Sequence, residues 1–293
     1  MQIFSILLDV VGPVFLIAFV GYLWARAGKP LDGTFVAVLV NTVSTPCLVI
    51  DTLTRSGLTF SILGTVGLAA VLTLLISAAL GYLLVRAMGG KVQTYLPSMI
   101  WSNGGNMGLP MSLFAFGDKG LALAIGFFAL SSMTNYTFGR AIAAGGMKFA
   151  DLVRMPIIWA IIIALLLIWT GLSLPPIVAR SLNLLGGLTV PLMLMSLGYS
   201  LASLRIASWQ RSLVFALARL LGGFAIGWGV AMLLGLEGVA RGVVVIQSAM
   251  PPAVLNYLWA ATYKNEPEEV AGIVVLSTLI SVALLPVFLW TVI

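Results

Sequence analysis

WSNGGNMGLPMSLFAFGD, residues 101–118, interrupts an otherwise apolar region of the chain. The stretch contains Asn103, Asn106, Pro110 and four glycines, whereas the segments on either side are strongly apolar. In a bilayer, irregular backbone is tolerated only where it is buried in protein or lines a water-filled cavity. We therefore interpret the stretch as a break near the middle of a membrane-spanning helix, and as a candidate binding site.

The composition of the whole chain predicts an integral membrane protein. Of its 293 residues, 61% are hydrophobic and only 8% are charged, and the mean hydropathy is +1.13, unlike a soluble domain of mixed composition. Apolar segments of about 20 residues recur without a sizeable polar domain between them, which favours helices over a β-barrel. The excess of 15 basic over 9 acidic residues is explained by cytoplasmic loops, so the predicted partner is the lipid bilayer and not nucleic acid.

Apolar segments bounded by charge, glycine or proline predict an all-α protein with about ten transmembrane helices. Their approximate ranges are 5–26, 31–54, 59–86, 92–116, 119–140, 151–171, 176–204, 209–235, 239–263 and 267–292.

Lysine and arginine are distributed unevenly over the predicted loops. With the N-terminus outside, ten basic residues fall on the cytoplasmic side: Arg26, Lys29, Arg86, Lys91, Arg140, Lys148, Arg154, Arg205, Arg211 and Lys264. Four fall on the opposite side: Arg55, Lys119, Arg180 and Arg241. The positive-inside rule therefore predicts a multi-pass protein of the plasma membrane with both termini outside.

Short sequence matches recur at about half the chain length. Gly126 in GFFALSSM and Gly272 in GIVVLSTL lie 146 residues apart, as do Ser102 and Ser248, and Pro46 lies 145 residues before Pro191. The chain is thus predicted to contain two five-helix repeats, 1–148 and 149–293. An odd number of helices in each repeat places the second copy upside down in the membrane, as in many secondary transporters.

The two repeats each contain an interrupted helix. The helix at 92–116 is broken around residues 103–110, and the helix at 239–263 is broken at Pro251 and Pro252. Proline removes a backbone donor and clashes with the preceding turn, which costs roughly 3 kcal/mol or more inside a helix. We expect the two broken helices to cross at the middle of the membrane, where such folds place their binding site.

The chemistry of such a crossing favours an anion. The second halves of both helices would begin near Pro110 and Pro252, and each helix N-terminus attracts a negative charge by about 0.3–1 kcal/mol, or about 2 kcal/mol when partly buried. A carboxylate is the natural ligand. Neutral donors are available nearby, without the cost of a permanent charge in the bilayer, from Asn103, Asn106, Gln247 and Asn256.

Two charged residues inside predicted helices are candidates for ion coupling or charge balance. An acid within a membrane helix is a functional hypothesis by default, but Asp51 precedes Arg55 by four residues, a spacing that also allows an ordinary ion pair. Arg219 lies deeper in its helix. It either balances the charge of a substrate or pairs with a helix terminus.

Several of these residues together resemble the auxin efflux carrier family, which includes plant auxin carriers and bacterial malate- and malonate-type permeases. The likeness covers the whole chain. Its most specific parts are Asn103 followed by Gly108-Leu109-Pro110 and GDKG, the run VVVIQSAMPPAV with Ala261 and Tyr263 after it, Arg219-Leu220, and Pro46.

The resemblance implies a scaffold of the helices at about 5–54 and 151–204, and a transport domain of those at about 59–140 and 209–292, which moves as an elevator. It also implies pairing of two copies through scaffold helices 2 and 7. Residue by residue, the family's crossover Asn is similar to Asn103, its crossover prolines to Pro110 and Pro251, and a site tyrosine to Tyr136. The helix face that covers the substrate is similar to residues 45–49.

The resemblance also shows differences. A polar position of the plant carriers is similar to Val49, and only about ten residues separate the fifth and sixth predicted helices, where many plant members have a long loop. A bacterial-type carboxylate permease is therefore the closer likeness. The predicted function is elevator-type transport of a small organic anion. The alternative is a sodium- or proton-coupled symporter of an organic acid on the related bile-acid-symporter-like fold.

Other function classes lack their sequence signals. The chain contains no His, and no nucleophile with a base partner is visible, so no enzyme is predicted. A channel would carry a continuous polar stripe along several helices, whereas polarity here is concentrated at the two breaks. No cofactor or metal is predicted, because both breaks lack the acids that would hold a cation.

Overall fold

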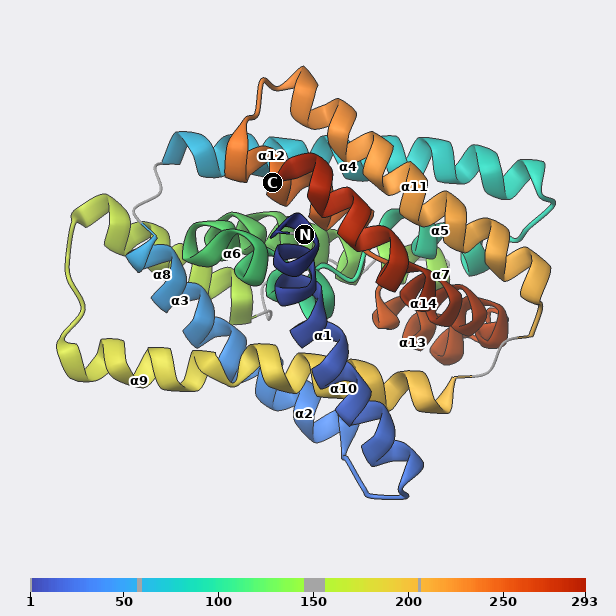
Figure 1. Ribbon diagram of the computed structural model, residues 1–293, viewed down its shortest axis with the longest axis horizontal. Coiled ribbons are helices and arrows are strands. Elements are labelled where there is room, and N and C mark those ends of the chain that lie inside the picture. The colour runs from blue at the N-terminus through green and yellow to red at the C-terminus, as the bar shows by residue number, and fades with distance from the viewer. Residues whose placement is uncertain (1, 57–59, 145–155, 205–206) are drawn as a thin grey trace.

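The computed structural model describes residues 2–56, 60–144, 156–204 and 207–293, and over these residues its regular elements are helices (Figure 1). The first half contains α1 (Gln2–Arg26), α2 (Gly33–Leu39), the π-helix η1 (Val40–Ser44), α3 (Thr45–Arg55), α4 (Phe60–Ala87), α5 (Val92–Ile100), the π-helix η2 (Gly104–Gly108), α6 (Leu109–Thr134), the π-helix η3 (Asn135–Gly139) and α7 (Arg140–Ala144). The second half contains α8 (Pro156–Thr170), α9 (Pro176–Gly187), α10 (Thr189–Ser203), α11 (Trp209–Leu233), α12 (Gly238–Ala249), α13 (Val254–Tyr263) and α14 (Pro267–Val292).

Six helical segments of the described chain are long and apolar enough to cross a membrane. They are Gly33–Arg55, Ser61–Ala87, Gly104–Ala144, Pro176–Ala202, Trp209–Leu233 and Pro267–Val292. Three shorter apolar helices accompany them, Val10–Arg26, Pro156–Thr170 and Gly238–Ala249. The prediction of an all-helical membrane protein is therefore confirmed. Three of the basic residues used to predict the orientation lie outside the described residues: Lys148, Arg154 and Arg205. The predicted boundary between the two repeats, at residues 148 and 149, lies outside them too.

The segment Gly104–Ala144 is divided at Gly117. Its 41 residues would extend about 60 Å as one straight helix, twice the roughly 30 Å of a hydrocarbon core. Gly117 has φ 65° and ψ −158°, a combination that is essentially restricted to glycine. Asp118 and Lys119 follow it and are exposed. The chain therefore turns here, between a half-helix that leaves the break and a longer helix that follows, as the sequence ranges 92–116 and 119–140 predicted.

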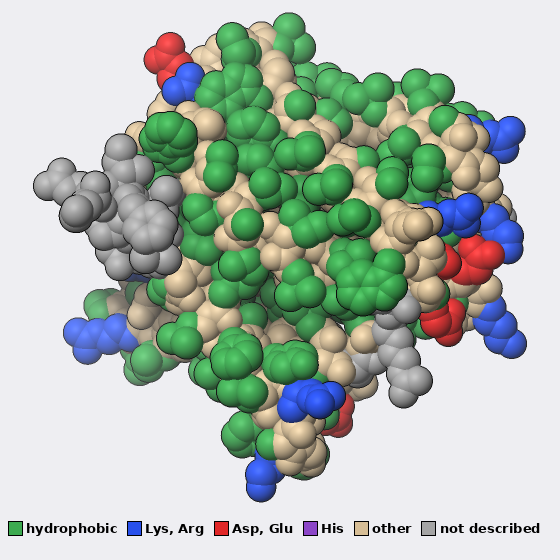
Figure 2. Space-filling view, turned by 45° about the vertical axis from the view of Figure 1, so that its right-hand side comes forward, with side chains coloured by type: hydrophobic (Ala, Val, Ile, Leu, Met, Phe, Trp, Pro, Cys, Tyr) green, Lys and Arg blue, Asp and Glu red, His purple; other side chains and the backbone are tan. Residues whose placement is uncertain are grey.

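The surface is suited to lipid. Apolar side chains cover most of the face shown in Figure 2, while charged side chains lie toward its margins. Trp169, Ile177 and Leu184 are each at least 75% exposed, which would be unfavourable in water but is ordinary against acyl chains.

Close helix packing depends on small residues. α1 crosses α10 (Figure 1), and a Cβ on Gly21 or Gly198 would collide with the backbone of Met195 or Ala18, respectively. A second close approach joins α11 to α12, because a Cβ on Gly223 would collide with the Ser248 carbonyl oxygen. Small residues permit such backbone contacts between membrane helices. The π-helix η2 lies between these two helix pairs, because it contacts α10 of the first pair and α12 of the second, as well as α6.

Candidate functional site

The two helix interruptions lie against each other. Residues 101–103 separate α5 from η2, and residues 250–253 separate α12 from α13. Ser102 and Pro252 form an antiparallel bridge. The Asn103 amide N donates to the Pro251 carbonyl O at 2.7 Å, and the Ala253 amide N donates to the Trp101 carbonyl O at 3.1 Å. These bonds satisfy backbone groups that the breaks remove from the helical pattern, as burial in a membrane requires.

The helical segment after the first break begins at Gly104, with Asn103 at its N-cap position. The Asn103 carbonyl O accepts from the amides of Met107 and Gly108 at 3.1 Å each, so the N–H groups of residues 104–106 have no helical carbonyl to donate to. α6 itself begins at Leu109, with the buried Pro110 as its second residue, as the sequence predicted. The π-helix η2 extends the helical pattern further back, so that its first residue, Gly104, lies six residues before Pro110. The second helix end agrees as well, because α13 begins at Val254, two residues after the buried Pro252.

Gln247 is a fully enclosed polar side chain at the junction. It is fully buried on α12, and neither its Oε1 nor its Nε2 has a hydrogen-bond partner. A Cβ on Gly104 would lie 2.6 Å from Oε1, and a Cβ on Gly108 would lie 2.8 Å from both Cδ and Nε2. The amide therefore occupies the space that these two glycines leave on the helix beginning at the break. Buried polar groups normally have partners, so each exception needs an explanation.

Further unpaired polar atoms lie at the junction and on elements that contact it directly or through a neighbouring helix. Asn103 is 4% exposed and its Nδ2 has no partner, while Asn106 is partly exposed. α10 contacts both η1 and η2, and α3 contacts α6. Buried hydroxyls on these elements that lack a hydrogen-bond partner are those of Ser44, Thr45, Ser112 and Thr189. Val49, in the segment expected to cover the substrate, is fully buried.

Asn256 is held in a hydrogen-bond network, in contrast to Asn103. Its Nδ2 donates to the Trp101 carbonyl O at 3.0 Å, and its Oδ1 accepts from Asn135 Nδ2 at 3.2 Å. Trp259 Nε1 donates to Asn135 Oδ1 at 3.3 Å, and the Tyr136 ring lies edge-on to Trp259 at 5.9 Å. Asn256 and Tyr136 therefore belong to one cluster that joins η3 to α13. Asn135 and Trp259 were not among the site residues predicted from the sequence.

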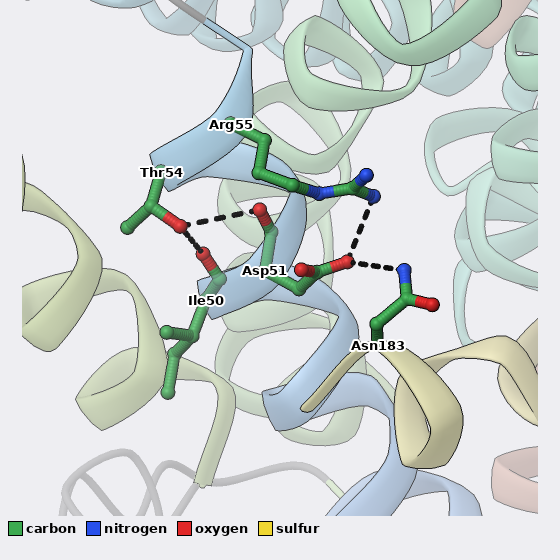
Figure 3. A network of polar contacts seen from close by, with 5 residues as sticks. All are labelled: Ile50, Asp51, Thr54, Arg55 and Asn183. Atoms are coloured by element: carbon green, nitrogen blue, oxygen red, sulfur yellow. Dashed lines mark hydrogen bonds and ion pairs between the residues drawn. The ribbon is translucent and has the colours of Figure 1, made fainter. Parts of the chain in front are cut away.

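Asp51, on α3, lies where α3 contacts α9 (Figure 3). It is 4% exposed. Its Oδ2 accepts from Arg55 Nη2 at 2.8 Å and from Asn183 Nδ2 at 3.0 Å. The i,i+4 ion pair that the spacing allowed is thus present, and the carboxylate also binds a neighbouring helix.

Arg219 contacts the carbonyl ends of two half-helices. It is 3% exposed on α11, and its Nη1 and Nη2 donate to the carbonyl oxygens of Met99, at 3.1 Å, and Ser248, at 2.9 Å. Met99 lies in the last turn of α5 and Ser248 in the last turn of α12. Of the two alternatives that the sequence left open, the geometry is that of pairing with helix termini. The described residues contain no cluster of three or more His, Cys, Asp or Glu that would hold a metal.

Comparisons with known proteins relate the chain to membrane transporters. Residues 140–289 match the family described as membrane transport protein. The chain is 27% identical to an uncharacterized transporter of Methanocaldococcus jannaschii over 97% of this chain and 98% of that protein. It is 29% identical to an uncharacterized transporter of Methanothermobacter thermautotrophicus, over 91% and 90% of the two chains. A rice protein named probable auxin efflux carrier component 1b is 27% identical over 48% of this chain and 27% of its own length.

Proposed function

The chain belongs to the membrane transport protein family, and on this premise we propose that it is a secondary transporter that moves a small organic anion, such as a carboxylate, across the plasma membrane. The observation that carries the proposal is the junction of the two interrupted helices. There, free helix N–H groups after Asn103 and the unpaired amide of Asn103 meet in a buried place. Groups left unpaired in the protein are the groups that a ligand would satisfy.

The chemistry of the junction favours a negative ligand. The half-helix that begins at Gly104 and the one that begins at Val254 both start at the junction, and each N-terminus has about half a positive charge. Asn103 adds a neutral donor. A carboxylate would accept hydrogen bonds from these groups, whereas a cation would be repelled by the helix ends.

Packing distinguishes two sets of helices. In the first set, α1 packs on α10, α3 packs on α8 and α9, and a smaller contact between α9 and α10 joins these two groups; the second set contains α4, α5, α6, α11, α12 and α14. The two sets meet where α1 contacts α6 and α14 and where α3 contacts α6. Backbone collisions at a glycine Cβ occur within these sets, at Gly198 and Gly223. Between the sets, a Cβ on Gly105 would lie 3.7 Å from Met193 Cε, an ordinary van der Waals contact. We propose that the first set is the scaffold and the second the transport domain of an elevator.

The rest of the topology follows from the sequence. We propose about ten transmembrane helices in two inverted repeats, with both termini outside, because the loop charges favour this orientation. Two copies would pair through α2 and α9, on which Phe35 is 63% and Ile177 76% exposed. Because a negative-inside potential favours anion exit by about 2.3 kcal/mol per charge per 100 mV, export needs no coupling ion and uptake does.

Thermal stabilisation of the purified protein tests the proposed ligand class. The panel contains mono- and dicarboxylates, auxin-like aromatic acids and Na⁺. A ligand that binds only the folded state stabilises it by about 2.7 kcal/mol at 100 times its dissociation constant. We expect a carboxylate to raise the melting temperature of the wild type and of Asn41→Ala, a control at an exposed asparagine of η1, but not of Asn103→Ala.

Two outcomes contradict the proposal. If folded, membrane-inserted Asn103→Ala keeps its carboxylate affinity and flux, the site is elsewhere. If Na⁺ alone stabilises the wild type and no organic anion does so without it, the cation-coupled symporter is the better description.

A further inference from the structure

The C-terminal ends of the two first half-helices present a charge problem of their own. α5 ends at Ile100 and α12 ends at Ala249, and each C-terminus has about half a negative charge from carbonyl groups without helical donors. Neither helix has a basic residue in its last turn. Two negative ends buried side by side in a bilayer would attract a cation from solution unless the protein supplies one.

Arg219 supplies that charge from a third helix. One of its nitrogens binds Met99 in the last turn of α5 and another binds Ser248 in the last turn of α12. The only ion pairs found within the described residues join Arg55 to Asp51 and Lys91 to Glu266. Within the described residues, the positive charge of the Arg219 guanidinium is therefore balanced by carbonyl groups and not by a carboxylate.

The local packing is arranged so that Arg219 reaches both ends. Gly223, one turn further along α11, leaves room for the Ser248 carbonyl, and a Cβ on Gly227 would lie 2.8 Å from Ser248 Cβ. These glycines bring α11 against the end of α12. A cavity of about 130 Å³ lies beside the guanidinium, lined by residues of α4, α5 and α11 that include Ser77 and Gly81.

We propose that Arg219 is a permanent, covalently attached counter-cation that occupies the position where a dissociable cation would otherwise bind between the ends of α5 and α12. A consequence for ion coupling rests on the proposed transport function. Because the guanidinium of Arg219 already supplies the positive charge in the domain that holds the anion, anion binding requires no Na⁺ or K⁺. Removal of the side chain would open a site for a small monovalent cation, with guanidinium the best fit because it restores the same donors.

The test measures cation binding without any substrate, so it is independent of the transport proposal. The melting temperatures of purified wild type, Arg219→Ala, Arg219→Gln and Arg219→Lys are compared in guanidinium, Na⁺ and choline chloride at equal, millimolar concentrations. Arg241→Ala is the matched control, because Arg241 lies on α12 with its guanidinium over the Trp228 ring and away from the carbonyl ends.

We expect Arg219→Ala to melt below the wild type and to be restored by guanidinium but not by choline. At ten times its dissociation constant, a bound cation raises the apparent folding constant of the variant about elevenfold. Wild type and Arg241→Ala should show no difference between the three salts. Arg219→Lys, which keeps the charge, should stay close to the wild type, whereas Arg219→Gln, which keeps only a neutral donor, should not.

Three results would overturn the inference. In the first, guanidinium and Na⁺ act on Arg219→Ala no differently from choline. In the second, the wild type is stabilised by Na⁺ specifically. In the third, Arg219→Gln is as stable as Arg219→Lys, which would mean that the position requires a hydrogen-bond donor and not a charge. This third result can be obtained even if Arg219→Ala cannot be purified.

Discussion

Gly108→Ala tests whether the junction depends on the close approach of Gln247. The new Cβ would lie 2.8 Å from both Cδ and Nε2 of Gln247, and closer still to Oε1. Ordinary van der Waals contact begins near 3.4 Å, so Cδ and Nε2 would have to move by roughly 0.6 Å and Oε1 by about 1 Å. Because Gln247 is fully buried, that movement must displace neighbouring atoms.

Two effects of opposite sign contribute to the result. Replacing glycine by alanine inside a helix stabilises it by roughly 0.5–1 kcal/mol, whereas overpacking a close-packed interior costs typically 1–3 kcal/mol. We expect the clash to win, with a net loss of about 1–2 kcal/mol. Gly229→Ala on α11 is the control, because a Cβ there meets no atom within 4 Å, and only the stabilising effect should remain.

A double-mutant cycle identifies the cause of the loss. The free energy of unfolding is measured in detergent for Gly108→Ala, Gln247→Ala and the double variant. If the clash is with Gln247, the double variant should be more stable than the sum of the single effects by about 1 kcal/mol or more, as expected for residues in contact. Strict additivity, or a Gly108→Ala variant as stable as Gly229→Ala, would refute this reasoning.

Two more substitutions test the framework around the junction. Gly117→Ala should lower the melting temperature, because strain at a backbone conformation essentially restricted to glycine costs about 1–3 kcal/mol; stability equal to that of Gly229→Ala would mean that the turn relaxes. Asn183→Ala should destabilise the protein by about 1–2 kcal/mol, because Asp51 loses a hydrogen bond. It should leave the pH profile of transport unchanged; a shifted profile would indicate that Asp51 takes part in proton coupling.

The sequence predicted the helix breaks because their signals are local. Proline and glycine weaken a helix wherever they occur, so residues 103–110 and the pair Pro251-Pro252 marked two interruptions that the structure places together. The repeat register stays a prediction. The internal matches relate Ser102 to Ser248, whereas the bridge between Ser102 and Pro252 is a contact and does not measure which residues of the two halves correspond.

Side-chain partners were not predictable, because they depend on contacts between distant segments. Asn103 and Asn256 are both asparagines next to a break, yet the first has an unpaired Nδ2, whereas both amide atoms of the second have a partner, in Asn135 and in the Trp101 carbonyl. Periodicity reports which residues are buried and in which element they lie. It does not report which of two buried amides remains available to a ligand.

The two ends of each broken helix have different roles in the proposed mechanism. A lysine or arginine facing the anion would be left without a partner whenever the carrier returned empty, at a cost of about 2.5 kcal/mol or more in a bilayer. Here the buried cation, Arg219, is bound to the carbonyl ends, and we propose that the anion meets only helix N–H groups and neutral amides. Each helix end contributes up to about 2 kcal/mol, so two ends favour a carboxylate over a neutral analogue by at most about 700-fold, since 1.4 kcal/mol is about tenfold. That preference selects anions while leaving binding weak enough for release, which a carrier needs and a permanent charge at the site would oppose.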